Sequence, residues 1–329
     1  MRVVVTGATG NVGSSVVAAL ANDDRVESVV GVARRLPKAH LPKVEWQKAD
    51  IRRSQLGPIF TGADAVIHLA WLIQPSKKPE VLASVNVHGS RRVFEAAVAS
   101  GVDILVHASS VGAYSPATGP EPVDESWLTR GIHSCSYSRD KASVERILDE
   151  MEAEHPHLRV VRLRPGLVFK RSAGAEVTRY FLGGWIPRRL IPSRLPVVPL
   201  PSGLVLQAVH SHDVASAYLA AVMNGDAHGA YNVAAEPVIT ARAVRERFGV
   251  RVVQVPPAAI RAGMSAAWHA GLQPTDPGWL DMAMQSPAMD CSRARDELGW
   301  TPQHSSMDAL TDMLGGVRDQ TSLATPVLR

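Results

Sequence analysis

The chain is poor in cysteine and has no long hydrophobic run. Its two cysteines, Cys135 and Cys291, cannot form a disulfide framework, and neither belongs to a paired metal-ligand motif. No uninterrupted apolar stretch is long enough to cross a bilayer, and Met1 leads into a predicted strand without a charged leader and apolar signal core. We therefore expect a cytoplasmic protein of a reducing compartment, with no metal site and no membrane partner.

Charge of one sign is also scarce. Lys and Arg total 35 and Asp and Glu total 31, which gives a net charge of +4. An excess this small does not predict a nucleic-acid partner. The sequence has no internal repeat, and its 329 residues are enough for a large core divided between a main domain and a smaller lobe.

Short runs rich in Val and Ile alternate with helical patterns, which is typical of a parallel sheet covered by helices. One such helix is expected over 85–100, where Gly101 ends it. The strands are predicted at 3–6, 28–33, 44–48, 65–69, 104–108 and 158–163, followed by a helix at 212–224, a strand at 230–234 and a helix at 292–300.

The first strand runs into the segment Thr6-Gly7-Ala8-Thr9-Gly10-Asn11-Val12-Gly13. Glycine suits a tight turn at the first position, close approach of a pyrophosphate at the second, and packing of helix on strand at the third. The apolar helix predicted over 14–20 directs its positive N-terminal end at the phosphates. The segment predicts a dinucleotide-binding site; the alternative is an ordinary strand-turn-helix connection.

A second pattern places Tyr137 and Lys141 four residues apart on one face of a predicted helix. An ammonium near a phenol lowers the phenol pKa from about 10 toward neutrality, and the phenol can then exchange a proton with a carbonyl or alcohol oxygen. The alternative is a surface pair on a helix. Ser109 and Ser110, at the carboxyl end of the predicted strand 104–108, favour the first interpretation, because ligands bind at this end of open parallel sheets.

Several motifs follow one another in order: Thr6-Gly-Ala-Thr-Gly-Asn-Val-Gly13, His68-Leu-Ala70, Asn86-Val-His-Gly89, Ser109-Ser110-Val-Gly-Ala-Tyr114, Tyr137-x-x-x-Lys141 and Arg164-Pro165-Gly166. Together they resemble the extended short-chain dehydrogenase/reductases, the NAD(P)-dependent epimerase/dehydratase-like family, over nearly the whole chain. The resemblance implies an α/β fold, a Rossmann-type doubly wound parallel sheet with a smaller C-terminal substrate lobe. We assign residues 1–168 and 204–235 to the NAD(P)-binding domain and residues 169–203 and 236–329 to the substrate lobe.

The resemblance also implies the residues of the site. The catalytic residues would be Ser110, Tyr137 as acid/base, Lys141, which also holds the nicotinamide ribose, and Asn86. The cofactor would be bound by Thr6, Gly7, Thr9, Gly10, Asn11, Val12, Gly13, Arg34, Arg35, Asp50, Ile51, Leu69, Ala70, Tyr137, Lys141 and Pro165.

The choice of cofactor depends on the end of the second predicted strand. An acid there would accept the ribose hydroxyls of NAD, but the chain has Ala33 followed by Arg34 and Arg35. Guanidinium groups bind a 2′-phosphate, so the pattern favours NADP over NAD; the alternative is that both arginines are solvated loop charges. The family segment at Asp50 would accept the adenine amino group, although Asp50 can equally cap a turn.

The substrate is less well defined. The irregular segment 170–203 carries arginines, among them Arg188 and Arg189, together with apolar residues and prolines, and we expect it to close over a substrate. The chain lacks the Asn that nucleotide-sugar enzymes of the family commonly carry after the Arg-Pro strand.

We therefore expect an NAD(P)-dependent ketoreductase-type oxidoreductase acting on a small or medium organic molecule. The alternatives are a nucleotide-sugar epimerase or dehydratase that recycles NAD, and a non-catalytic cofactor-sensing or structural protein on the same fold. A homodimer through the helices over 85–100 and 138–150 is one expected assembly.

Overall fold

The computed structural model describes residues 1–38, 40–73, 76–174, 197–273, 275–319 and 321. Its main sheet has seven parallel strands in the order β10-β6-β5-β4-β1-β2-β3. These strands are β1 (Arg2–Thr6), β2 (Ser28–Ala33), β3 (Val44–Lys48), β4 (Ala65–His68), β5 (Ile104–Ala108), β6 (Arg159–Pro165) and β10 (Gly229–Val233). The predicted doubly wound parallel sheet is confirmed, and each predicted strand lies within two residues of its observed bounds.

The burial of each strand follows its place in the sheet. The central strands β1 and β4 are buried almost throughout, as expected for short apolar strands covered on both faces. The edge strand β3 is partly exposed along its length, with Glu45 and Lys48 facing solvent. At the other edge, β10 pairs with β6 from Gly229 opposite Val161 to Val233 opposite Pro165.

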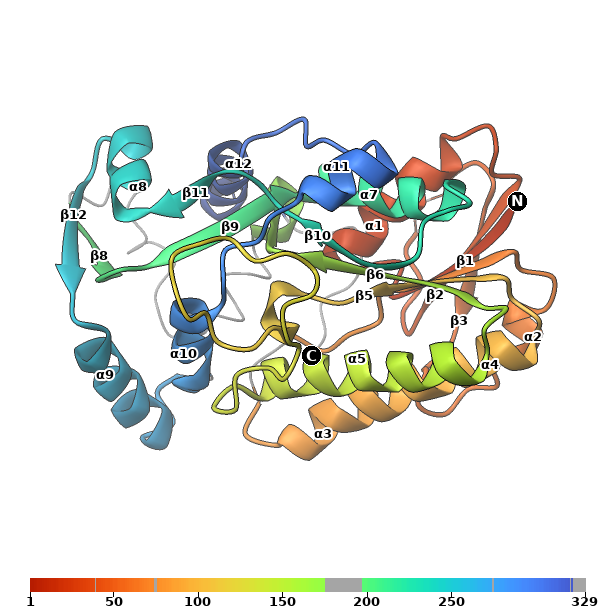
Figure 1. Ribbon diagram of the computed structural model, residues 1–329, viewed down its shortest axis with the longest axis horizontal. Helices are drawn as coiled ribbons and strands as arrows, with labels where there is room; N and C mark the ends of the chain where they lie inside the picture. Colours follow the sequence, from red (N-terminus) through yellow and green to blue (C-terminus); the bar gives the residue numbers. More distant parts are fainter. Residues whose placement is uncertain (39, 74–75, 175–196, 274, 320, 322–329) are drawn as a thin grey trace.

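Helices cover both faces of this sheet (Figure 1). One face holds α1 (Asn11–Ala21), α7 (Ser211–Met223) and α11 (Ser292–Leu298), and their buried residues join one apolar cluster with the strands. The other face holds α2 (Gly57–Phe60), α4 (Ser90–Ala99) and α5 (Ser136–Glu154), which form a second cluster. The two clusters are the core, because each buries one face of the same strands.

The helix predicted over 85–100 is more irregular than its pattern suggested. After α3 (Pro79–Ala83) the chain makes a π-helix, η1 (Ser84–Gly89), and then continues as α4. Gly101 follows with a φ of +70°, so the predicted stop at this residue is confirmed.

The C-terminal lobe contains two small sheets. One has the order β11-β9-β7, formed by Ala235–Thr240, Val205–His210 and Leu167–Phe169, and the other pairs β12 (Arg251–Val255) with β8 (Val197–Pro201). The predicted main-domain segment 204–235 thus contains one strand, β9, that pairs in the lobe.

Helices α8 (Ala241–Phe248), α9 (Pro257–His269), α10 (Gly278–Gln285) and α12 (Ser306–Asp319) complete the lobe. The predicted irregular segment 170–203 begins with the short helix η3 (Arg171–Ala173) and ends with β8; residues 175–196, including Arg188 and Arg189, lie outside the described residues. In the described part of the chain, no helix is both long and apolar enough to cross a membrane.

Candidate active site

The glycine loop after β1 is held against the end of β4. Gly7 has a φ of +70°, and a Cβ on it would lie 2.6 Å from backbone atoms of Leu69 and Ala70. A Cβ on Gly13 would lie 2.2 Å from the Gly7 carbonyl oxygen. Gly10 donates to that oxygen at 3.0 Å. Glycine is therefore required at positions 7 and 13, where a side chain would push the loop off the sheet.

The loop leads directly into α1. Gly10 caps the helix without a side-chain hydrogen bond, and the first turn, which contains Val12, carries no acidic residue. Asn11 fixes the turn to the lobe: its Nδ2 donates to the Val168 carbonyl at 2.9 Å, and its carbonyl accepts from Lys170 Nζ at 2.7 Å. The N–H groups and the dipole at this end of α1 therefore suit an anion.

The other predicted cofactor residues lie around the same edge of the sheet. Thr6 ends β1, and its Oγ1 is 2.6 Å from Nδ1 of His68. Thr9 lies in the loop, and Pro165 is buried at the end of β6. Since parallel strands present their carboxyl ends together, the structure brings these residues to one edge.

The segments after β2 and β3 form a basic rim. Ala33 is buried at the end of β2, Arg34 is exposed and Arg35 is half-buried. Arg52 Nη2 is 2.7 Å from Oδ2 of Asp50. This hydrogen bond is the main cause that lowers the Asp50 pKa to about 2, and the charge of Arg34 contributes. Asp50 is thus already paired, while Arg34 lies near enough to affect it.

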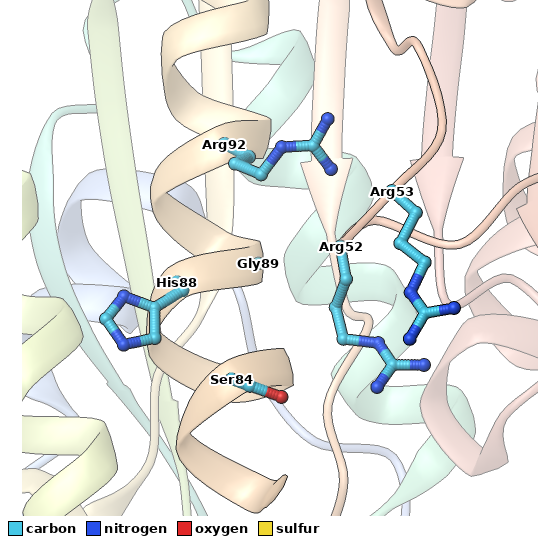
Figure 2. Close-up of a pocket in the computed structure, with 6 residues that line it drawn as sticks. All are labelled: Arg52, Arg53, Ser84, His88, Gly89 and Arg92. Carbon is cyan, nitrogen blue, oxygen red and sulfur yellow. The ribbon is translucent and has the colours of Figure 1, made fainter. Parts of the chain in front are cut away.

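A cavity of about 320 Å³ lies on the outer side of this rim, between η1, the start of α4 and the segment after β3 (Figure 2). It is lined by Arg52, Arg53, Ser84, His88, Gly89 and Arg92. Arg92 donates to the carbonyls of Ser54, at 2.9 Å, and of Ile51, whose side chain is buried against Gly89. The cavity borders the segment predicted to hold the adenosine part of the cofactor. Ser110, Tyr137 and Lys141 do not line it.

Ser110 and Tyr137 lie together at the carboxyl end of β5. Ser110 starts the short helix η2 (Val111–Ala113), and its Oγ accepts from the Gly112 N–H at 3.0 Å. Tyr137 lies in the first turn of α5, where the Ser110 side chain is hydrogen-bonded to the phenol. The structure therefore brings these two predicted residues into contact.

Burial dominates the ionisation of Tyr137. It raises the phenol pKa to about 12, and the hydrogen bond from Ser110 only partly opposes this change. The prediction that Lys141 lowers this pKa toward neutrality is wrong for this structure, because the ammonium is directed elsewhere. At neutral pH the phenol keeps its proton and can act as a donor.

Lys141 is buried below Tyr137, with 3% of its surface exposed. Its Nζ donates to the Ala108 carbonyl at 2.6 Å and lies 3.4 Å from the centroid of the Trp71 ring, against 5.8 Å from that of Tyr137. Burial lowers the Lys141 pKa to about 7, although the charge of Glu145 opposes the change. The residue therefore changes its charge near neutral pH.

Asn86 lies in the π-helix η1 and is buried. Its Oδ1 accepts from the Leu72 N–H at 2.8 Å, and its Nδ2 donates to the Leu72 carbonyl and to Asp140 Oδ2, each at 3.1 Å. These contacts tie the segment after β4 to α5, next to Lys141. The structure thus shows a positioning contact, and the catalytic role of Asn86 stays a prediction.

Glu145 was missed by the sequence reasoning. It is buried one turn after Lys141 and accepts from Arg164 Nε and Nη2 at 2.9 and 3.0 Å, from Arg162 at 3.1 Å and from Ser109 at 2.5 Å. These charges lower the Glu145 pKa to about 2 despite its burial. The signal available was an acid four residues after Lys141 together with arginines at alternate positions of β6.

The aromatic neighbours of Tyr137 were also missed. The Trp71 ring lies edge-on to the phenol ring with centroids 6.0 Å apart, and the Trp279 ring lies at 34° with centroids 5.3 Å apart. Cys135 has its Sγ 3.9 Å from the sulfur of Met282, and burial raises its thiol pKa to about 11. Because Trp279 and Met282 belong to the lobe, no local pattern connects them to Tyr137.

The sequence profile of the NAD dependent epimerase/dehydratase family matches residues 3–234. The chain belongs to this family. The protein y4nG of Sinorhizobium fredii, described as uncharacterized, is 28% identical over 82% of this chain and 67% of its own length. This chain spans about a third of the length of several mycobacterial relatives, 31% in each, that match it at 26% identity.

An L-arabinose 1-dehydrogenase (NAD(P)(+)) of Haloferax volcanii is 28% identical over 62% of this chain and 87% of its own length. Among solved structures, MoeE5 in complex with UDP-glucuronic acid and NAD superposes with a TM-score of 0.72 at 23% identity, covering 97% of this chain and 100% of that one. At this level of identity the superposition supports the fold alone.

The residues present fit the family's dinucleotide. Positions 7 and 13 have no room for a side chain, and the N-terminus of α1 lacks a side-chain cap, so a pyrophosphate can approach the backbone there. The buried indole N–H of Trp71 has no hydrogen-bond partner among the described residues, and its ring lies on Lys141. A polar ligand atom at this place would satisfy that donor.

Proposed function

We propose that the protein is an NAD(P)-dependent oxidoreductase that interconverts a ketone and an alcohol on a small or medium organic substrate. The observation that carries this proposal is the contact of the Tyr137 phenol with Ser110, with Lys141 Nζ 5.8 Å from the centroid of the phenol ring, at the sheet edge that holds the glycine loop. The similarity to an arabinose dehydrogenase that uses NAD(P)(+) supports the same class of reaction.

Each site residue has its own role in the proposed reaction. When bound, a nicotinamide cofactor supplies or accepts the hydride. Ser110 Oγ hydrogen-bonds the substrate oxygen, and Tyr137 transfers its phenolic proton to that oxygen as the carbonyl carbon gains the hydride, which gives an alcohol and the oxidised cofactor. The Lys141 ammonium would hold the ribose hydroxyls of the cofactor.

In the free protein the Tyr137 phenol is in its proton-donating form. A phenol with a pKa of about 12 is protonated at pH 7, so it is ready to donate. Oxidation of an alcohol requires the phenolate, which in turn requires a positive charge near the ring. We infer that NADPH-dependent reduction is the reaction to test first, since Arg34 and Arg35 favour the phosphorylated cofactor.

The test combines two measurements on purified protein. Mass spectrometry identifies any nucleotide that copurifies, and absorbance at the reduced-cofactor band follows net oxidation with a panel of ketones and nucleotide sugars. Net oxidation with ketones supports the proposal. Tightly retained NAD with interconversion of a nucleotide sugar and no net oxidation would instead establish an epimerase or dehydratase, and no conversion of either class would support a non-catalytic protein.

A matched pair of variants tests the role of Tyr137. Tyr137→Phe should lower turnover by roughly 10² to 10⁴ and leave cofactor affinity nearly unchanged, the usual scale for loss of a general acid/base. Tyr218→Phe is the control, because Tyr218 is buried on α7 with no hydrogen-bond partner for its hydroxyl among the described residues. Normal turnover by Tyr137→Phe would refute the assignment.

A further inference from the structure

Helix α10 of the C-terminal lobe packs against the residues of the proposed catalytic centre. Trp279 and Met282 are one turn apart on this helix. Trp279 contacts the Tyr137 ring, and a Cβ on Gly112 would lie 3.0 Å from Cε1 of Tyr137 and 3.1 Å from the sulfur of Met282. Because Gly112 has no side chain, the Tyr137 ring and the Met282 thioether can both pack against its backbone.

Trp71 closes another side of this space. Its ring meets Tyr137 edge-on and covers the Lys141 ammonium. Trp71, Tyr137, Trp279 and Met282 are each half-buried, so each keeps part of its surface accessible in the described structure. Four such side chains from three separate segments form a concentrated apolar patch, which is the usual lining of a small-molecule site.

Two carboxylates near this patch are already paired within the described residues. Asp281 on α10 forms an ion pair with Arg261 at 2.8 Å, and Asp276 Oδ1 accepts from the Gly278 N–H at 2.8 Å. Burial is the main cause of the raised Tyr137 pKa and of the lowered Lys141 pKa. Both changes disfavour the charged form of the side chain, as expected in apolar surroundings. The surroundings of the phenol therefore disfavour a charged substrate group.

We propose that Trp71, Trp279 and Met282 form the substrate-binding wall and select a carbonyl compound with an apolar, preferably aromatic, group next to the carbonyl. This inference rests on the proposed ketone/alcohol function. The aromatic rings and the thioether stabilise an apolar group by burial and by edge-on or tilted ring contacts.

The test compares two uncharged ketones, acetophenone and dihydroxyacetone, with NADPH and the full-length protein. The wild type should reduce acetophenone with at least roughly 10-fold higher kcat/KM. Trp279→Ala should lower kcat/KM for acetophenone roughly 10- to 100-fold, mainly through KM, and lower that for dihydroxyacetone much less, so that the ratio of the two values falls. Trp279→Phe, which keeps an aromatic ring, should retain most of the preference.

Trp268→Ala is the matched control, because Trp268 is a half-buried tryptophan of α9 whose ring contacts are Lys77 and His269. It should leave the ratio of the two ketones unchanged. If Trp279→Ala does not fold, Trp279→Phe and Met282→Gln take its place, with loss of the acetophenone preference expected for Met282→Gln alone.

The possible failures are distinguishable. If ketones are reduced but Trp279→Ala affects both equally, or the wild type prefers dihydroxyacetone, the apolar wall is refuted and the ketone/alcohol function stands. If calorimetry shows UDP-glucose bound more tightly than acetophenone while ketones are reduced, the wall is refuted as well. If no ketone is reduced, both the function and the inference fall.

Discussion

Glu145→Gln should destabilise the protein strongly, although Glu145 touches neither the glycine loop nor Tyr137 in the described contacts. Its carboxylate is buried and accepts two hydrogen bonds from Arg164, one from Arg162 and one from Ser109. Glutamine has nearly the same shape but no charge, so the variant leaves the buried Arg164 guanidinium without its counterion. Arg162 keeps its ion pairs with Asp149 and Glu152. The loss of stability in this variant therefore reports how strongly these hydrogen bonds and ion pairs hold α5 to the strands β5 and β6.

Two arguments give the same magnitude. Removing one partner of a buried ion pair costs roughly 3–5 kcal/mol. Independently, the Glu145 pKa falls from 4.5 to about 2 on folding, which corresponds to about 3 kcal/mol of folding free energy at neutral pH. Because the folded-state pKa is lowered, this contribution is fully present above pH 4.5 and is lost as the pH falls from 4.5 toward 2.

Denaturant unfolding of wild type and Glu145→Gln from pH 7 to pH 3 measures both the loss of stability and its dependence on pH. At pH 7 we expect Glu145→Gln to reduce the free energy of unfolding by about 3 kcal/mol. As the pH is lowered, the difference from wild type should shrink, because Glu145 of the unfolded wild type is protonated below its ordinary pKa of 4.5 and this stabilises the unfolded state. Other paired carboxylates titrate in both proteins and cancel in the difference.

Glu150→Gln is the matched control on the same helix. Glu150 lies 3.0 Å from Arg91 with side chains 57% and 43% exposed, so its loss should change stability by less than about 0.5 kcal/mol. The reasoning is refuted if Glu145→Gln costs less than about 1 kcal/mol at pH 7, below the range for a buried pair. A difference between the two proteins that stays constant down to pH 3 would refute it equally.

Three further predictions concern the cofactor and pH. Gly13→Ala should destabilise the fold by roughly 1–3 kcal/mol and weaken NADPH binding, whereas Gly263→Ala, at an open position of α9, should stabilise it by up to about 1 kcal/mol; melting curves with and without NADPH compare them. Replacing Arg34 and Arg35 by Ala should move the preference toward NADH, and equal affinities for both cofactors in the wild type at low salt would show that these arginines are solvated charges. With Lys141 at a pKa of about 7, kcat/KM should fall as the pH rises through 7, and a flat profile from pH 6 to 9 would contradict a role for its charge.

The main sheet was predictable because its signals are local. Each central strand is a short apolar run, and helices with their own pattern separate most of the parallel neighbours in the chain. The C-terminal lobe was not, because β7, β8 and β12 are short strands of three to five residues that are stabilised by partners far away in the chain. A three-residue strand such as Leu167–Phe169 has too few positions to show a period.

The candidate site also contains residues that local motifs predict and residues that only the three-dimensional structure brings there. Gly7, Gly13, Ser110 and Tyr137 stand in motifs whose spacing reflects a backbone requirement, and the structure brings them to one edge of the sheet. The direction of the Tyr137 pKa was predicted wrongly, because burial depends on the three-dimensional surroundings and not on the spacing to Lys141. Trp279 was not found for a related reason: its contact with Tyr137 crosses from the lobe to the main domain.

The position of β10 has a consequence for synthesis of the chain. Strand β6 pairs with β5 on one side and with β10 on the other, but β10 is made only after the whole stretch from β7 to α7. While the ribosome extends that stretch, the outer edge of β6 exposes unpaired N–H and C=O groups beside the apolar surface that α7 later covers. Exposed strand edges of this kind pair with other chains, so a nascent or truncated protein ending before Gly229 is the form most exposed to aggregation and to chaperone binding.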